Sequence, residues 1–294
     1  MSRRFALLVN PASAGGRALQ SLPEVHAALD RLGAEHRTVT TRSIEHASDE
    51  AERAADRGET VAALGGDGLL RPLAGALKHR DAALALIPLG RGNDLARVLD
   101  IPKDVGAAAR IAVEGDERLL DVANVDGRPY LGIASLGFDS DANRVANEAK
   151  LVRGNAVYLY AALRALAAWR PATFGVTVDG VRHDMTGYSV AVGNSRAYGG
   201  GMFLLPHAQL DDGRLDVLLT KDCSKLTFLR SLPKVFKGTH LGSPYAETLR
   251  GEVVEVTSDR PFVVYADGDP IGATPATMRV ERRCLRVIVP RAPG

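Results

Sequence analysis

Cysteine is scarce, since the 294 residues include only two. Cys223 and Cys284 stand far apart, with no CxxC motif and no neighbouring pair of histidines. This spacing argues against a zinc site and against a fold held together by disulfides. It is typical of a protein in a reducing compartment.

Long apolar runs are also missing. No stretch approaches the ~20 apolar residues that a membrane-spanning helix needs. The run 5–9 follows Arg3 and Arg4, as in a signal peptide, but it is too short for the apolar region of one. We therefore expect a cytoplasmic protein whose contact with a membrane, if it has one, is peripheral.

The chain has no marked excess of charge of either sign. It carries 37 basic and 35 acidic residues, a net charge of +2. Such a balance gives no overall attraction to nucleic acid, which we do not expect as a partner. An anionic partner would have to be bound by a local basic patch.

One such patch lies in the segment 224–240, SKLTFLRSLPKVFKGTH. It has four basic residues and no acidic one, and Pro233 predicts two short helical pieces rather than one. Its apolar residues either pack on the rest of the protein or, with the basic ones, face an anionic lipid surface. The basic residues are Lys225, Arg230, Lys234 and Lys237.

The length favours two domains. The first ~125 residues alternate strand and helix signals, which predicts a Rossmann-like parallel α/β sheet. Later segments show apolar alternation separated by turns, which is typical of an antiparallel sheet or β-sandwich. We divide the chain into an α/β nucleotide-binding domain (1–122), a mainly antiparallel β domain (123–280) and a C-terminal segment (281–294) that returns to the first domain. Within the α/β part we expect strands at 5–9, 37–41, 60–64 and 83–88, and helices at 19–32 and 47–57.

Three polar, glycine-bearing loops follow predicted strands, at 10–16, 65–68 and 90–94. The carboxyl ends of parallel strands meet at one edge of a sheet, where such folds bind ligands. Glycine lets main-chain N–H groups approach phosphate oxygens, and a following helix adds its positive end. The loops contain neither a P-loop motif nor a dinucleotide fingerprint.

The chain resembles the diacylglycerol kinase catalytic family, which includes sphingosine, ceramide and bacterial lipid kinases. GGDG alone is shared with NAD kinases and phosphofructokinases, but PLGRGNDLAR and a late DGD are more specific to lipid kinases. The resemblance covers residues 7 to 270 and rests on LLVNPASAGG, ALGGDG, IPLGRGNDLARVL, LGIASLGFD, HAQLDDGRLDVLL and YADGDP.

The resemblance implies ATP and Mg²⁺ as cofactors and a membrane lipid as substrate, bound by the second domain. Asp67 would position Mg²⁺, and Asp269 would be the general base for the lipid hydroxyl. A second, structural magnesium would be bound by Gln209, Asp212 and the carbonyl of Arg214. The residues implied to hold the nucleotide are Asn10, Pro11, Ser13, Gly15, Thr41, Gly65, Gly66, Asp67, Gly68, Arg71, Gly90, Arg91, Gly92, Asn93 and Asp94.

Several residues depart from the family pattern. Leu69 and Arg71 stand where the family has threonine and asparagine, and Arg91 replaces another threonine. Both arginines are candidate phosphate contacts. Asp269 replaces a glutamate, which withdraws the carboxylate by roughly 1 Å, and catalysis is sensitive to such displacements. The departures bear on activity rather than on the fold.

Three functions are consistent with the sequence. The first is ATP-dependent phosphorylation of a lipid hydroxyl, as in diacylglycerol; the second is a catalytically weak regulator that binds lipid or nucleotide. The third is an NAD kinase, which would share GGDG but would not account for PLGRGNDLAR. The sequence leaves open which lipid is bound and whether the protein is a homodimer.

Some site residues also have a purely structural interpretation. Asp211-Asp212-Gly213 is a good turn between strands, and Asp267-Gly268 is a good hairpin turn. Asn93-Asp94 would serve as a cap for the helix that follows.

Overall fold

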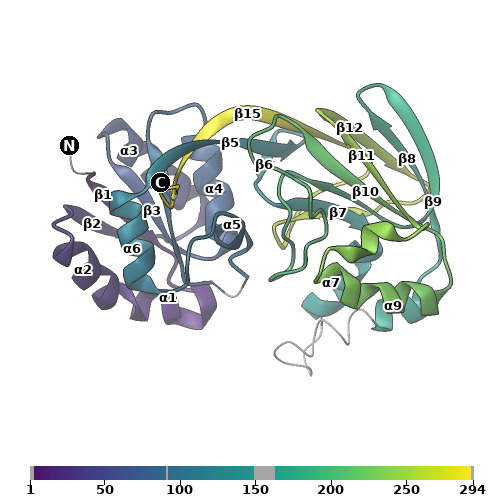
Figure 1. Ribbon diagram of the computed structural model, residues 1–294, viewed down its shortest axis with the longest axis horizontal. Helices are drawn as coiled ribbons and strands as arrows, with labels where there is room; N and C mark the ends of the chain where they lie inside the picture. Colours follow the sequence, from purple (N-terminus) through teal and green to yellow (C-terminus); the bar gives the residue numbers. More distant parts are fainter. Residues whose placement is uncertain (1–2, 91, 149–162, 293–294) are drawn as a thin grey trace.

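The structure is a computed structural model that describes residues 3–90, 92–148 and 163–292. Arg91, a predicted phosphate contact, lies outside the described residues. The chain forms two bodies, joined by the long strands β5 (Asp116–Val125) and β15 (Ala276–Val289), which run from one body to the other (Figure 1).

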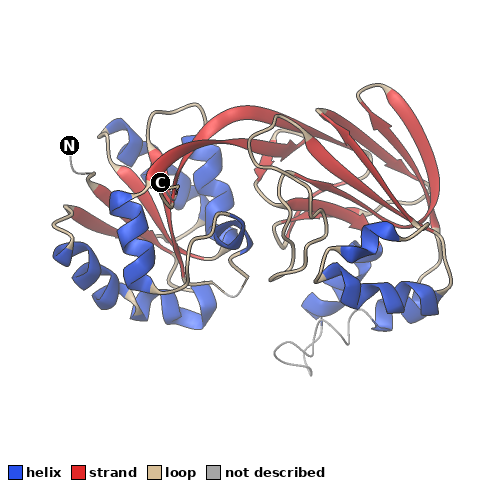
Figure 2. Ribbon diagram, in the orientation of Figure 1, coloured by secondary structure: helices blue, strands red, loops and turns tan. Residues whose placement is uncertain are grey.

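The first body contains a parallel sheet in the order β4-β3-β1-β2. Strands β1, β3 and β4 are buried along their whole length, as expected for apolar runs covered on both faces. Helices flank this sheet (Figure 2). The strands are β1 (Phe5–Val9), β2 (His36–Thr40), β3 (Thr60–Gly65) and β4 (Ala83–Pro88).

Six α-helices connect or follow these strands. One begins earlier than the predicted residue 47, because the Ser43 hydroxyl accepts a hydrogen bond from His46 N at 3.1 Å and caps the helix. The three residues before Ala47 bury no apolar side chain, so the apolar pattern alone did not reveal them. The helices are α1 (Arg17–Gln20), α2 (Leu22–Arg31), α3 (Ile44–Asp56), α4 (Asp67–Leu77), α5 (Asp94–Val98) and α6 (Val105–Glu114).

The second body is mainly antiparallel, with the strand order β14-β13-β7-β9-β8-β12-β15. Together the two bodies confirm the predicted fold class. The apolar alternation at 128–133 is shared by two strands, because the chain bends at Leu131 and Gly132. The strands are β6 (Arg128–Tyr130), β7 (Ile133–Gly137), β8 (Ala172–Val178), β9 (Val181–Gly193), β10 (Leu215–Lys221), β11 (Ala246–Gly251), β12 (Val253–Ser258), β13 (Val263–Ala266) and β14 (Asp269–Ala273).

Strand β15 couples the two bodies. It pairs with β12 and β5 in antiparallel fashion, and Arg286 and Val287 then pair with β4 in parallel. The predicted boundaries after residues 122 and 280 therefore fall inside the two connecting strands. The two domain boundaries remain predictions.

Two helices, α7 (Phe138–Glu148) and α9 (Lys225–Val235), lie together at one end of the second body (Figure 1). Helix α9 is continuous through Pro233, so the predicted break into two pieces is wrong. Pro233 has no N–H group, so the helix loses one main-chain hydrogen bond there. Because α9 ends two residues later, almost none of the helix follows the proline. In the described part of the chain, no helix is long and apolar enough to span a bilayer.

Candidate active site

The loops after β3 and β4 touch through their main chains. Gly65 O accepts hydrogen bonds from Leu89 N at 2.9 Å and from Gly90 N at 3.1 Å. A Cβ atom on Gly90 would lie 2.4 Å from Gly66 Cα. Glycine is therefore required here because the two chains pass too closely for a side chain.

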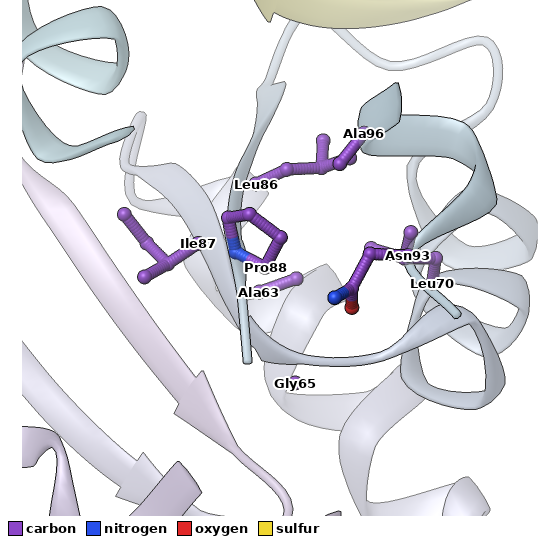
Figure 3. Close-up of a pocket in the computed structure, with 8 residues that line it drawn as sticks. All are labelled: Ala63, Gly65, Leu70, Leu86, Ile87, Pro88, Asn93 and Ala96. Atoms are coloured by element: carbon purple, nitrogen blue, oxygen red, sulfur yellow. The ribbon is translucent and has the colours of Figure 1, made fainter. Parts of the chain in front are cut away.

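Asn93 holds the second of these loops in place. Its Oδ1 accepts from Gly90 N and its Nδ2 donates to Gly90 O, both at 2.9 Å, and the residue is buried with φ 52°. Asn93 stands at the N-cap position of α5, as predicted, but its side chain makes no cap hydrogen bond. Figure 3 shows its amide among the residues that line a cavity of about 10 Å³. That volume is at the lower limit for one water, so this space is packed core.

Asp67 provides the cap of α5 instead. Its carboxylate accepts from Asp94 N at 3.2 Å and from Leu95 N at 3.4 Å. A Cβ atom on Gly92 would lie 3.0 Å from Asp67 Oδ2. Asp67 thus faces the 90–94 loop and has a structural role that the sequence did not reveal.

Asp94 links the first body to the second. Its two carboxylate oxygens accept from Gly200 N at 3.1 and 2.8 Å. Burial raises the pKa of Asp94, and the neighbouring Asp67 raises it further. The loop that carries the predicted phosphate contacts is therefore fixed against the second body.

The first predicted loop lies beside Gly65. Asn10 Oδ1 accepts from Ala12 N at 2.9 Å in a turn at the end of β1. A Cβ atom on Gly65 would lie 3.0 Å from Ser13 Oγ, so these two loops also approach closely. Thr41 is buried, and its hydroxyl donates to Val9 O at 3.1 Å.

The remaining residues of this first loop, Pro11 and Gly15, complete its turn. Gly15 has φ 71°, a conformation that favours glycine, within a 3₁₀ turn (Ser13–Gly16). The structure therefore brings the described parts of all three predicted loops together at one edge of the sheet.

Asp269 lies at the same edge, although it belongs to the second body. It follows the turn at Asp267 and Gly268, whose φ angles of 52° and 92° confirm the hairpin interpretation. A Cβ atom on Gly68 would lie 3.9 Å from Asp269 Oδ2. The proposed base therefore reaches the 65–68 loop from almost the other end of the chain.

The two departures from the family pattern at 71 and 269 are in contact. Arg71 Nη2 lies 3.5 Å from Asp269 Oδ2, and the two side chains are 16% and 49% exposed. Arg71 comes from the second turn of α4, one residue before Pro72. The guanidinium of the first body therefore contacts the carboxylate of the second body.

Asp267 is a site residue that sequence reasoning treated only as part of a turn. Its oxygens accept from Leu131 N and Gly132 N, both at 2.9 Å. Burial raises the pKa of Asp267 to about 6, opposed by these amides and by Arg71 but reinforced by Asp67. Its place in the YADGDP motif was the signal that could have identified it.

A further acidic residue, Asp139, lies near the start of α7. Burial raises the pKa of Asp139 to about 7. Nearby, the hydroxyl of the partly buried Tyr198 lies 3.1 Å from Ser135 Oγ and accepts from Asn143 Nδ2 at 3.4 Å. Burial and the charge of Asp139 raise the pKa of Tyr198 to about 12.

This raised pKa predicts a pH-dependent stability. Between about pH 4 and pH 7 the folded state binds more protons at Asp139 than the unfolded state, so stability falls as the pH rises through that window. Asp139→Asn removes the effect and is expected to stabilise the protein at pH 8 by about 2–4 kcal/mol, with little change at pH 4. Urea unfolding at both values measures this. The control Asp141→Asn, on the same helix, should show no such difference, and an equal gain at both values would contradict the explanation.

The residues predicted for a structural magnesium lie in a turn at the surface. Gln209 is exposed, and Asp212 accepts from Arg214 N at 2.9 Å and forms an ion pair with Arg250. Gly213, with φ 71°, donates its N–H to the buried Asp121 at 2.6 Å. The turn interpretation thus accounts for the observed bonds, and a cation on Asp212 would have to displace Arg250. The magnesium assignment stays a prediction.

A different group of potential metal ligands lies at the junction of the bodies. Among the described residues, ligand atoms of His79, Glu281 and Cys284 lie within 4.8 Å of one another. Lys78 Nζ lies 2.6 Å from Glu281, and burial raises the pKa of the Cys284 thiol to about 11. Both the ammonium and the protonated thiol disfavour a bound cation.

Comparisons with known proteins agree with this geometry. Residues 4–125 match the diacylglycerol kinase catalytic domain, and residues 132–289 match the YegS C-terminal NAD kinase beta sandwich-like domain. A diacylglycerol kinase of Mycobacterium tuberculosis is 34% identical, with 98% of this chain and 96% of that protein aligned. A probable YegS-like lipid kinase of Pseudomonas fluorescens is 31% identical, with 99% and 97% aligned. A solved diacylglycerol kinase structure from Bacillus anthracis shares the fold, with a TM-score of 0.73 over 98% and 97% of the chains at 19% identity.

The fold, the loops and these matches define the class of protein. The chain is a lipid kinase in which glycine-rich loops of an α/β body face a mainly antiparallel β body. It belongs to the diacylglycerol kinase family, since similarity at 34% identity extends over nearly its whole length.

Proposed function

We propose that the protein transfers the γ-phosphoryl group of ATP, with Mg²⁺, to the hydroxyl of a diacylglycerol-like lipid. The observation that carries the proposal is the position of Asp269, whose carboxylate lies beside Gly68 in the glycine-rich loop. A general base must lie within hydrogen-bond reach of the acceptor hydroxyl, which itself must face the phosphoryl group. The Asp269 side chain lies beside this loop and is 49% exposed.

The residues present fit a nucleotide. Gly66 and Gly90 expose main chain where a side chain would clash, and the 65–68 loop leads into the N-terminus of α4. Such a helix start attracts phosphate. When bound, ATP and Mg²⁺ would supply the phosphoryl group and neutralise its charge. Asp67 would hold the metal, and Asp269 would accept the proton of the lipid hydroxyl.

One observation keeps the regulator as a second candidate. Arg71 lies 3.5 Å from Asp269 Oδ2, the oxygen beside Gly68, so an acceptor hydroxyl would have to displace the guanidinium or bind the other oxygen. A protein in which this contact persists with nucleotide bound would bind without turnover.

The test is a transfer assay with radiolabelled ATP, Mg²⁺ and a panel of lipids in detergent micelles, with NAD included. Label in a lipid is the expected result. Binding of ATP without transfer to any lipid would favour the regulator, and label in NAD would favour an NAD kinase.

Peripheral membrane contact is part of the proposal, and α9 supplies a candidate surface. Phe228 and Val235 are buried in the second body, but Leu226 and Phe236 are 55% and 57% exposed. The basic residues of the segment are also exposed. Of these, Lys225 donates to Ala167 O at 2.7 Å and so has a structural contact.

Replacing Arg230, Lys234 and Lys237 with glutamine is therefore expected to weaken binding to phosphatidylglycerol vesicles. At roughly 1 kcal/mol for each basic residue near the surface, the affinity should fall about 10²-fold at low salt. Vesicle sedimentation at several salt concentrations measures the affinity and its salt dependence, which should become flatter. Glutamine at Arg57, Lys103 and Arg110, exposed on the first body, is the matched control. Unchanged binding in the α9 variant would place the membrane surface elsewhere.

A further inference from the structure

The two bodies are joined by a pair of neighbouring strands. The chain passes from the first body to the second along β5 and returns along β15, and the two strands lie side by side (Figure 1). Their antiparallel ladder extends from Asp116 to Val125 of β5, so it continues into both bodies. A rotation of one body relative to the other must therefore bend this two-stranded ribbon.

The ladder of the ribbon is interrupted at one point, where β15 has a bulge. Between the paired segments, three residues of β15 (282–284) stand opposite Asp121 alone. Arg283 has φ 45°, a left-handed conformation that is uncommon for a residue other than glycine. The bulge separates the part of β15 that pairs with β12 from the part that pairs with β4. Because a bulge disrupts the ladder and bends the strand, the ribbon bends most easily here.

A group of polar contacts holds the residue before the bulge against the first body. Glu281 Oε1 lies 2.6 Å from Lys78 Nζ, and Glu281 Oε2 lies 2.9 Å from His79 Nε2. Asn124 Nδ2, on β5, donates to Oε1 at 3.4 Å. Burial opposes ionisation, but the hydrogen bonds with Lys78 and His79 lower the pKa of Glu281. We call Glu281, Lys78 and His79 the hinge latch.

Helix α4 makes its contacts with the second body and β15 on one face. Arg71, Gly75 and Lys78 recur at helical spacing. Arg71 lies 3.5 Å from Asp269 Oδ2, and Lys78 contributes to the hinge latch. Between them, a Cβ atom on Gly75 would lie 3.0 Å from Pro129 Cγ, so the helix and β6 pack closely. The face therefore has the hinge latch at its C-terminal end and the Asp269 carboxylate near its N-terminal end.

This arrangement makes the position of Asp269 sensitive to the angle between the bodies. Positions 68 and 78 are about 15 Å apart along the helix, so a rotation of about 5° at the hinge latch moves Asp269 by roughly 1 Å relative to the 65–68 loop. A displacement of ~1 Å in a catalytic geometry can cost about 10²-fold in rate.

We propose that Glu281 is a positioning residue: the hinge latch fixes the angle at which the two bodies meet at the bulge, and so sets the distance of Asp269 from the 65–68 loop. The catalytic part of this inference rests on the proposed function. Without the hinge latch the bodies rotate about the ribbon, and only the molecules with Asp269 beside the loop turn over.

The first measurement is the distance between the bodies, which does not depend on turnover. Spin labels are attached at Glu24→Cys on α2 and Arg230→Cys on α9, since both positions are exposed and both helices lie far from the connecting strands in Figure 1. Cys223→Ser and Cys284→Ser remove the native thiols. Electron double resonance should give one narrow distance distribution for this labelled parent. Glu281→Gln, which removes the charge and keeps the size, should broaden the distribution and shift it to longer distances.

The second measurement is turnover, with the native cysteines in place. Glu281→Gln should lower kcat at least about tenfold, because the loss of a charge-assisted hydrogen bond shifts a two-state equilibrium by that factor. The affinity for ATP should change little, because the three glycine-bearing loops belong to the first body. Lys78→Gln removes the other half of the pair and should have the same two effects, so the test does not depend on the folding of one variant.

Two further variants separate positioning from a general loss of stability. Lys78→Glu combined with Glu281→Lys restores the pair with its charges exchanged, and should recover most of the turnover and the narrow distribution. Glu247→Gln breaks a Lys–Glu pair of similar length, 2.7 Å from Lys221, within the second body. It should change neither kcat nor the distance distribution, and thermal unfolding confirms that each variant folds.

The outcomes distinguish this inference from the proposed function. An unchanged distance distribution in Glu281→Gln and Lys78→Gln would overturn the hinge latch, whatever the turnover. A broadened distribution with unaltered kcat would overturn the positioning role. Absence of transfer to every lipid by the wild-type protein would reject the proposed function, and the positioning role with it, while the distance distribution alone would still decide whether the hinge latch holds the bodies.

Discussion

Asp67→Asn is expected to lower turnover at least ~10²-fold, because it removes the charge that would hold Mg²⁺ against the transferred phosphoryl group. The amide is nearly the same size and can still accept a hydrogen bond from Asp94 N or Leu95 N, the contacts that Asp67 makes in the structure. The cap of α5 should therefore survive in part, with a loss of about 1 kcal/mol or less. Transfer assays at saturating ATP and lipid measure the effect.

A matched control separates catalysis from capping. Asp104 caps α6 by accepting from Ala107 N at 2.8 Å, and its helix takes no part in the site. Asp104→Asn should change stability by a similar amount and leave turnover unaltered. Retention of most of the turnover in Asp67→Asn would refute the nucleotide site as assigned.

The glycine-rich loops were predictable from the sequence because each follows a buried apolar run directly. Parallel strands end at the same edge, so the positions of the 10–16, 65–68 and 90–94 loops follow from topology alone. The contact between Arg71 and Asp269 was not predictable in this way. It depends on how β13 and β14 fold back onto the first body, and no local pattern carries that information.

The hydrogen bonds that cap helices could not be predicted from local sequence either. Asn93-Asp94 has the composition of a helix cap, but the Asn93 side chain binds Gly90, and Asp67 caps α5 from another loop. Helix α9 passes through Pro233 because the proline stands near its end. In each case the conformational preference of the residue is compatible with more than one geometry, and tertiary contacts determine which geometry forms.

The second large effect is expected at Asp269. If its carboxylate accepts the proton of the lipid hydroxyl, Asp269→Asn should lower turnover at least ~10²-fold, the usual share of general-base catalysis, with little change in ATP affinity. Asp259→Asn, on an exposed loop of the same body, serves as the control. Unaltered turnover in Asp269→Asn would rule out Asp269 as the base and direct attention to Asp267 or Asp139.

The contact between Arg71 and Asp269 makes the same experiment more informative. Asp269→Glu lengthens the side chain by one methylene and is expected to keep or raise activity, because the carboxylate extends further toward the 65–68 loop. Arg71→Asn alone frees the Asp269 oxygen that now faces the guanidinium 3.5 Å away. The double variant should differ from the sum of the single effects, since residues in contact are energetically coupled. Strict additivity of the two changes in kcat would mean that Arg71 and Asp269 act separately, and that the pair seen in the structure has no part in catalysis.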